Sequence, residues 1–121
     1  MAVAFKNHSF PARLRYALNG IAHALRAEHS LQFQAGALVA AIAGLIVLRP
    51  RPVWWALVLL AAALVVAAEL MNTALEELAD HLSPEEHPRI RLVKDCAAGA
   101  VLVAVLGALG VALALLVELL R

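Results

Sequence analysis

Three long apolar runs constrain this chain more than any other feature of its sequence. They are free of charged residues and extend from Ala35 to Leu48, from Val53 to Ala68 and from Cys96 to Val117. The third is long enough by itself to cross a bilayer, which requires about 20 residues, and the first two reach that length when their polar flanks continue the helix. Because backbone groups in lipid must bond within their own segment, we expect membrane-spanning helices at about 31–48, 53–80 and 95–118.

The composition supports a small membrane protein and excludes several other classes. Apolar residues make up 64% of the 121 residues, against roughly 45–50% in a typical soluble domain. This length predicts a single domain, 1–121. Ten Lys and Arg residues nearly balance nine Asp and Glu residues, so no basic field indicates nucleic acid as a partner. A single cysteine, Cys96, excludes an intrachain disulfide and a multi-cysteine metal site.

The segment before the first run is expected to form an amphipathic surface helix over about 11–29. Its apolar residues recur every three or four positions and share one face: Leu14, Leu18, Ile21 and Leu25. A helix of this kind lies in the membrane interface rather than across it. The predicted fold is therefore an all-α membrane protein, with three transmembrane helices after an interfacial helix.

The distribution of Lys and Arg predicts the orientation of these helices. Seven basic residues lie before the first span or in the loop before the third, whereas Arg49, Arg51 and Arg121 lie on the opposite side. The positive-inside rule then places the N-terminus in the cytoplasm. The N-terminal region has no signal-peptide hydrophobic core. We expect a multi-pass protein of the bacterial cytoplasmic (inner) membrane.

A stripe of polar side chains marks the end of the second span. At about 100° per residue, four of them fall within roughly 80° of one another: Glu69, Asn72, Glu76 and Asp80. Glu69 is the deepest, and an ionisable group inside a transmembrane helix is by default a functional-site hypothesis. Each residue taken singly also has a structural explanation. An amide in a membrane bundle often bonds across helices, and charged carboxylates usually occupy a solvated helix end. The joint pattern indicates a site at the boundary between lipid and water.

Other polar groups are expected on the same side of the membrane. Glu28 ends the surface helix, and Lys94-Asp95 opens the third span. Glu28 and Glu76 suit Mg²⁺, which proteins hold through one or two carboxylates plus substrate phosphates. Lys94 would neutralise phosphate charge, and a partly desolvated Glu69 suits a general base. This layout predicts phosphoryl transfer from a soluble nucleotide to a membrane alcohol, without a P-loop, because the sequence has no GxxxxGK[ST] motif.

These residues resemble the prokaryotic diacylglycerol kinase family of small integral membrane lipid kinases. The similar segments are Glu28, Glu69-Leu-Met-Asn72-Thr-Ala-Leu-Glu76 with Asp80, and Lys94-Asp95-Cys-Ala-Ala-Gly-Ala-Val-Leu. The resemblance covers almost the whole chain. It implies a homotrimeric bundle with active sites shared between protomers. It also implies ATP with Mg²⁺ as the donor and a membrane lipid alcohol as the acceptor.

The resemblance further implies roles for individual residues. Glu69 matches the catalytic base of the family, and Glu28 and Glu76 match its divalent-metal ligands. The positions that match nucleotide-binding or catalytic positions are Tyr16, Asn72, Asp80, Lys94 and Asp95, with Glu85 and His87 in the matching nucleotide-side loop.

Departures from the family pattern leave the acceptor open. Ser9 stands where diacylglycerol-specific members carry an arginine, for which Arg13 or Arg15 would have to substitute. The Asn-Thr-Ala and Ala-Ala-Gly-Ala-Val-Leu segments are also similar to the branch that phosphorylates undecaprenol. Diacylglycerol, giving phosphatidic acid, is the favoured acceptor, and undecaprenol, giving undecaprenyl phosphate, is the alternative. Two other classes stay open: a small proton-coupled transporter with Glu69 as the proton carrier, and a non-catalytic membrane scaffold.

Overall fold

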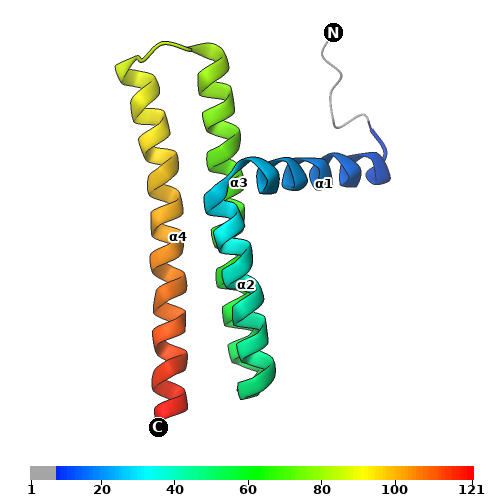
Figure 1. Cartoon of the computed structure of the whole chain (residues 1–121), viewed down its shortest axis with the longest axis vertical. Coiled ribbons are helices and arrows are strands. Elements are labelled where there is room, and N and C mark those ends of the chain that lie inside the picture. Colours follow the sequence, from blue (N-terminus) through cyan, green and yellow to red (C-terminus); the bar gives the residue numbers. More distant parts are fainter. Residues whose placement is uncertain (1–7) are drawn as a thin grey trace.

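The computed structural model describes residues 8–121, and this part of the chain is helical with short connections. Its helices are α1 (Phe10–Ala27), α2 (His29–Leu48), α3 (Pro52–Leu82) and α4 (Pro88–Leu120). The last three lie along a common direction with alternating polarity, while α1 extends crosswise from the start of α2 (Figure 1). The predicted all-α fold is confirmed.

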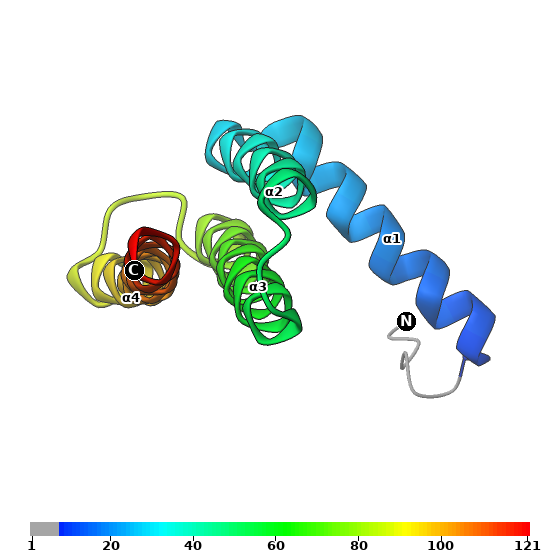
Figure 2. The same ribbon diagram turned by 90° about the horizontal axis from the view of Figure 1, so that it is seen from below.

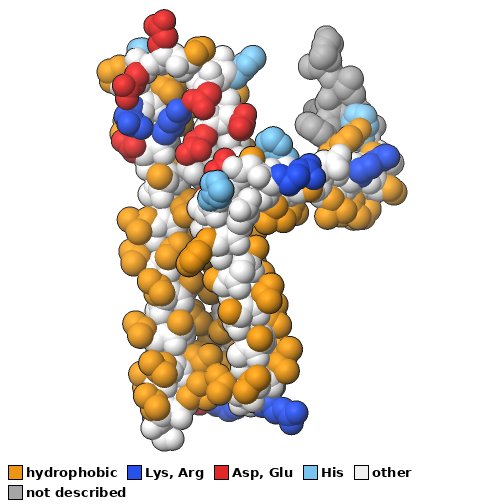
Figure 3. Space-filling model, viewed as in Figure 1, with side chains coloured by type: hydrophobic (Ala, Val, Ile, Leu, Met, Phe, Trp, Pro, Cys, Tyr) orange, Lys and Arg blue, Asp and Glu red, His pale blue; other side chains and the backbone are white. Residues whose placement is uncertain are grey.

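Three of these helices, α2, α3 and α4, are long and apolar enough to cross a membrane. Both α3 and α4 continue past their apolar runs toward the loop that joins them, so α4 begins at Pro88 rather than near residue 95. Charged side chains gather around this loop, and apolar side chains cover the middle of the molecule (Figure 3). The polar stripe of α3 therefore remains helical up to the charged end.

The surface helix ends two residues earlier than predicted because Glu28 interrupts it. Glu28 has extended backbone angles, with φ −110° and ψ 114°, and α2 begins at the next residue. The side chain of Gln32 fixes the corner, since its Nε2 donates a hydrogen bond to the backbone oxygen of Leu25 at 2.9 Å. The chain thus turns at Glu28 from the crosswise helix into the first span.

Helix α3 lies between α2 and α4 and packs against both (Figure 2). Few apolar side chains are buried within the single chain, and most large ones on the three long helices remain exposed. An apolar surface of this extent requires cover by lipid or by other subunits. Membrane insertion agrees with this packing.

The end of the bundle opposite the α3–α4 loop is held by an ion pair between α4 and the α2–α3 turn. Arg51 Nη2 lies 2.8 Å from Glu118 Oε1, and Arg121 lies 3.7 Å from the other oxygen of the same carboxylate. Arg49 adopts a left-handed conformation in this turn, with φ 50°. Exposed pairs of this kind contribute about 0–1 kcal/mol, so the ion pair orients the turn more than it stabilises the fold.

Candidate active site

Glu69 is the most deeply placed acidic residue of the polar stripe on α3. Its side chain is only 5% exposed, between the buried Val65 and Thr73 on the same helix face. Its Oε1 accepts a hydrogen bond from Gln34 Nε2 on α2 at 3.1 Å. Within residues 8–121, no Lys, Arg or His forms an ion pair with it. A buried carboxylate without a cationic partner is a candidate reacting group rather than half of a structural ion pair.

One turn closer to the loop, Asn72 orients Glu76. Asn72 Nδ2 donates a hydrogen bond to Glu76 Oε1 at 3.3 Å, and both side chains are half-buried. The other amide atom, Asn72 Oδ1, is buried and has no hydrogen-bond partner in the described part of the chain. This region of α3 therefore offers two hard oxygen donors, a held carboxylate and a free amide oxygen. Both suit a magnesium ion.

Asp80 and Lys94 join the charged ends of α3 and α4. Lys94 Nζ donates to Asp80 Oδ1 at 2.6 Å, with the two side chains 30% and 65% exposed. A polar hollow of about 170 Å³ lies beside them and is lined by both residues together with the loop residues, including Glu85 and His87. The structure thus brings together four of the residues that were predicted to contact a nucleotide.

The loop side chains also stabilise the local backbone. His87 Nδ1 accepts a hydrogen bond from the backbone N–H of Arg89 at 3.1 Å and so caps the start of α4. The Ser83 hydroxyl donates to the backbone oxygen of Glu85 at 2.8 Å. His87 therefore has a structural role in this chain, whether or not it also meets a ligand.

The remaining predicted residues lie on α1, at its corner with α2, and on α4. Tyr16 lies on α1, with its hydroxyl oxygen 3.5 Å from His8 Nδ1, and Glu28 lies at the corner between α1 and α2. Asp95 is exposed on α4. The predicted site residues thus come from α1 and its corner as well as from α3, α4 and their loop.

The described residues place no three His, Cys, Asp or Glu side chains where they would together hold a metal ion. This donor set nevertheless fits Mg²⁺, which takes one or two protein carboxylates and completes its shell with water and substrate phosphates. Glu76 with the free oxygen of Asn72 meets that requirement on α3. Glu28 would supply the second carboxylate.

Ser9, which stands where diacylglycerol-specific members of the family carry an arginine, is the N-cap residue of α1. Its hydroxyl oxygen accepts a hydrogen bond from the backbone N–H of Ala12 at 3.4 Å, as an N-cap residue does. Arg13 and Arg15 follow on the exposed surface of the same helix. The cap explains why serine suits this position structurally.

Gln34 is the residue of this site that the sequence analysis did not select. The available signal was a polar side chain close to the start of an apolar run, where polar groups are unfavourable unless they are paired. Its partner lies on another helix and 35 positions away in the sequence. Spacing along one helix does not reveal such a pair.

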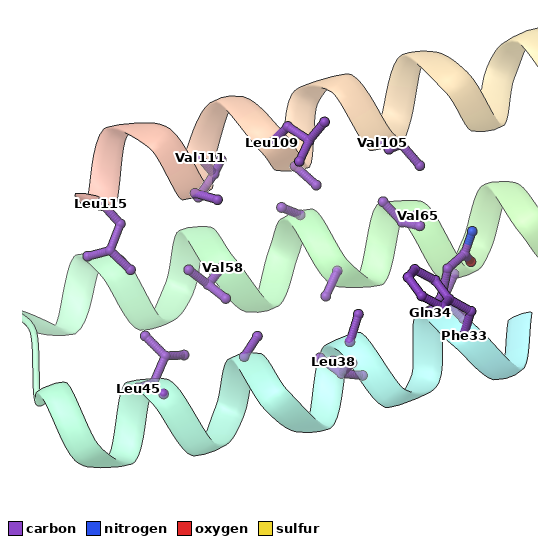
Figure 4. A pocket seen from close by; sticks show the side chains of 18 of the residues that line it. Phe33, Gln34, Leu38, Leu45, Val58, Val65, Val105, Leu109, Val111 and Leu115 are labelled. Atoms are coloured by element: carbon purple, nitrogen blue, oxygen red, sulfur yellow. The ribbon is translucent and has the colours of Figure 1, made fainter. Parts of the chain in front are cut away.

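An apolar groove of about 540 Å³ ends beside Gln34. It lies among α2, α3 and α4, and Gln34 is the one polar side chain among the described residues that line it. Phe33, Gln34 and Val65 lie at one end of this groove and Leu115 lies toward the other (Figure 4). A second groove, of about 640 Å³, lies between α3 and α4 and includes Asn72. An apolar surface therefore leads up to Gln34, the residue that donates a hydrogen bond to the buried carboxylate.

Comparisons with known proteins agree with this arrangement. Residues 15–116 match the family described as prokaryotic diacylglycerol kinase. The chain is 35% identical over 95 residues to a diacylglycerol kinase of Synechocystis sp.. The aligned segment covers 78% of this chain and 54% of that relative. It is 33% identical over 88 residues to an undecaprenol kinase of Bacillus subtilis. That aligned segment covers 73% of this chain and 72% of the relative. The match thus spans about half the length of the first relative and most of the second.

Proposed function

Because the chain belongs to the prokaryotic diacylglycerol kinase family, we propose that it is a lipid kinase that transfers the terminal phosphate of ATP to a membrane alcohol. One observation carries the proposal: Glu69 is buried, has no cationic partner among residues 8–121 and lies near the end of an apolar groove. The polar hollow with Lys94 lies at the charged end of the same helix pair. Membership of this family does not favour the proton-coupled transporter.

In this proposal Glu69 is the general base. The acceptor hydroxyl oxygen attacks the terminal phosphorus of ATP, and the bond from that phosphorus to the bridging oxygen of ADP breaks. The electron pair of that bond leaves with ADP, while the hydroxyl proton moves to the Glu69 carboxylate. A positioned base of this kind contributes about 10²–10⁴-fold to a rate.

The other polar residues serve the nucleotide and its metal. Mg²⁺, when bound, offsets the charge that develops on the phosphate oxygens. Glu76, oriented by Asn72, and Glu28 would hold it. Lys94 would pair with phosphate oxygens beside Asp80. The remaining nucleotide contacts are proposed to come from Tyr16, Glu85, His87 and Asp95.

We propose that the active protein is a homotrimer whose protomers share these sites. Tyr16 and Glu28 lie on α1 and at its corner, whereas the other site residues lie on α3, α4 and their loop, and in a trimer these elements of neighbouring protomers would come together. The exposed apolar faces of the long helices also support it. The excess of basic residues around the N-terminal helix and the α3–α4 loop supports a cytoplasmic location for both, in the inner membrane.

Diacylglycerol is the proposed acceptor, with phosphatidic acid as the product. Undecaprenol is the alternative, supported by the identity to an undecaprenol kinase over 72% of that relative's length. Purified protein in mixed micelles would be given labelled ATP with each lipid separately, with Mg²⁺ or with a chelator. Labelled phosphatidic acid that requires Mg²⁺ is the expected result. If only undecaprenol became labelled, undecaprenol rather than diacylglycerol would be the acceptor. If no lipid became labelled, the kinase proposal would be contradicted.

Replacing Lys94 with glutamine is expected to raise the KM for ATP. A hydrogen bond to a charged group contributes about 1.5–3 kcal/mol, which corresponds to roughly 10- to 100-fold in binding. The side chain is 30% exposed and its pair with Asp80 lies at the surface, so the melting temperature should change little. ATP titrations at saturating lipid would measure the effect. Arg89→Gln, which removes an equal charge from an exposed position on the same helix, is the control.

A further inference from the structure

The bond between Gln34 and Glu69 is the only side-chain hydrogen bond that joins α2 to α3 in the part of the chain that the structure describes. Gln34 Nε2 donates to Glu69 Oε1 at 3.1 Å. Glu69 is buried, and Gln34 is half-buried at the end of an apolar groove. Partial burial strengthens a hydrogen bond, because the local dielectric constant is lower than that of water. The contact therefore restricts where the Glu69 carboxylate lies.

The other half of the Gln34 amide is unused. Its Oε1 is buried and has no hydrogen-bond partner within residues 8–121. A buried carbonyl oxygen without a donor is unfavourable, and native structures rarely leave one without a reason. Gln34 thus keeps a free acceptor beside the residue proposed to receive a proton.

An amide suits both protonation states of a carboxyl group. An ionised carboxylate only accepts hydrogen bonds, whereas a protonated carboxylic acid also donates one through its O–H. Glutamine carries a donor and an acceptor on one planar group, and rotation about its last torsion exchanges them. A hydrocarbon side chain offers neither group.

We propose that Gln34 positions Glu69 throughout the proton transfer, donating from Nε2 to the carboxylate before transfer and accepting through Oε1 from the carboxylic acid after it. This inference rests on the proposed role of Glu69 as the base. The proton passes from the acceptor hydroxyl to Glu69, and Gln34 neither gains nor loses one. Gln34 is a positioning residue because it acts through Glu69.

The test compares two identical substitutions on one helix. Gln34→Met keeps an unbranched side chain of similar length but removes both hydrogen-bonding groups. It should lower kcat about 10- to 100-fold, since a small misplacement of a reacting group has effects of that size. The KM for MgATP should stay within about threefold. Gln32→Met removes an amide that bonds backbone oxygens of α1 instead, and should keep kcat within about threefold.

A second variant separates positioning from packing. Gln34→His supplies a ring with one donor and one acceptor nitrogen, so it should recover a large part of the kcat that Gln34→Met loses. Melting temperatures of all variants would be measured in the same micelles. Wild-type kcat in Gln34→Met, or equal loss in a well-folded Gln34→His, would overturn the inference. So would parallel losses of activity and melting temperature in Gln34→Met and Gln32→Met.

Glu69→Gln, assayed alongside, separates this inference from the proposed function. An inactive Glu69→Gln with a fully active Gln34→Met would overturn the role of Gln34 alone. A fully active Glu69→Gln would overturn the base assignment, and the role of Gln34 with it.

Discussion

Glu69→Gln is expected to lower kcat by about 10²–10⁴-fold, the usual contribution of a general base. Glutamine has almost the same size and can still bond to Gln34, but it cannot take a proton from the acceptor hydroxyl. The KM for MgATP should stay within about threefold, because the residue lies on the lipid side of the site. Initial rates of labelled phosphatidic acid formation at saturating ATP, lipid and Mg²⁺ would measure the change.

Glu77→Gln provides the matched control. It makes the same change of charge and shape on the same helix, at an exposed position away from the stripe. We expect its kcat to remain within about twofold of wild type. Similar losses in both variants would point to a general effect of removing charge from α3, and an active Glu69→Gln would show that the base is another group.

Glu76→Gln is expected to raise the Mg²⁺ concentration for half-maximal activity by at least about 10- to 100-fold. Substitutions of the groups that merely orient a metal ligand already have effects of that size. Glutamine has a side chain of the same length and can still accept a hydrogen bond, but it lacks the negative charge that a hard cation prefers in its ligands. A Mg²⁺ titration of initial rate at fixed ATP would measure the shift.

Activity at high Mg²⁺ concentration distinguishes a variant with weaker metal binding from a misfolded variant. If Glu76 holds the ion, high Mg²⁺ should restore much of the rate of Glu76→Gln, since added ligand compensates for weaker binding. A rate that stays low at every Mg²⁺ concentration, or an unchanged titration curve, would contradict this assignment. Glu77→Gln again serves as the control and should titrate like the wild type.

Much of the fold could be predicted because it depends on local properties of the chain. An uncharged apolar run in lipid must be helical whatever its neighbours are, so the three spans followed from three stretches of sequence. The stripe from Glu69 to Asp80 was equally local, because the period of a helix fixes which side chains share a face. The end of α1 was predicted two residues too late, because Glu28 breaks the helix through backbone angles that no nearby proline or glycine signals.

Contacts between helices required the tertiary structure. The ion pair between Asp80 and Lys94 depends on how the α3–α4 loop aligns the two helices. His87 caps α4 because this helix starts seven residues before its predicted span. Gln34 reaches Glu69 only in one register of α2 against α3. Helix-to-helix register depends on the summed packing of many side chains, and spacing along one helix carries no information about it.

The amino-acid sequence alone predicted three membrane-spanning helices, an interfacial surface helix and a row of polar groups at one end of α3. These features depend on hydrophobicity and helical period, which are properties of single segments. The partners of Glu69 and Lys94 depend on how the helices pack: an amide on α2 for Glu69 and a carboxylate on α3 for Lys94. The reason is that a hydrogen bond requires two groups within about 3 Å, and helix packing brings residues 14 or 35 positions apart to that distance.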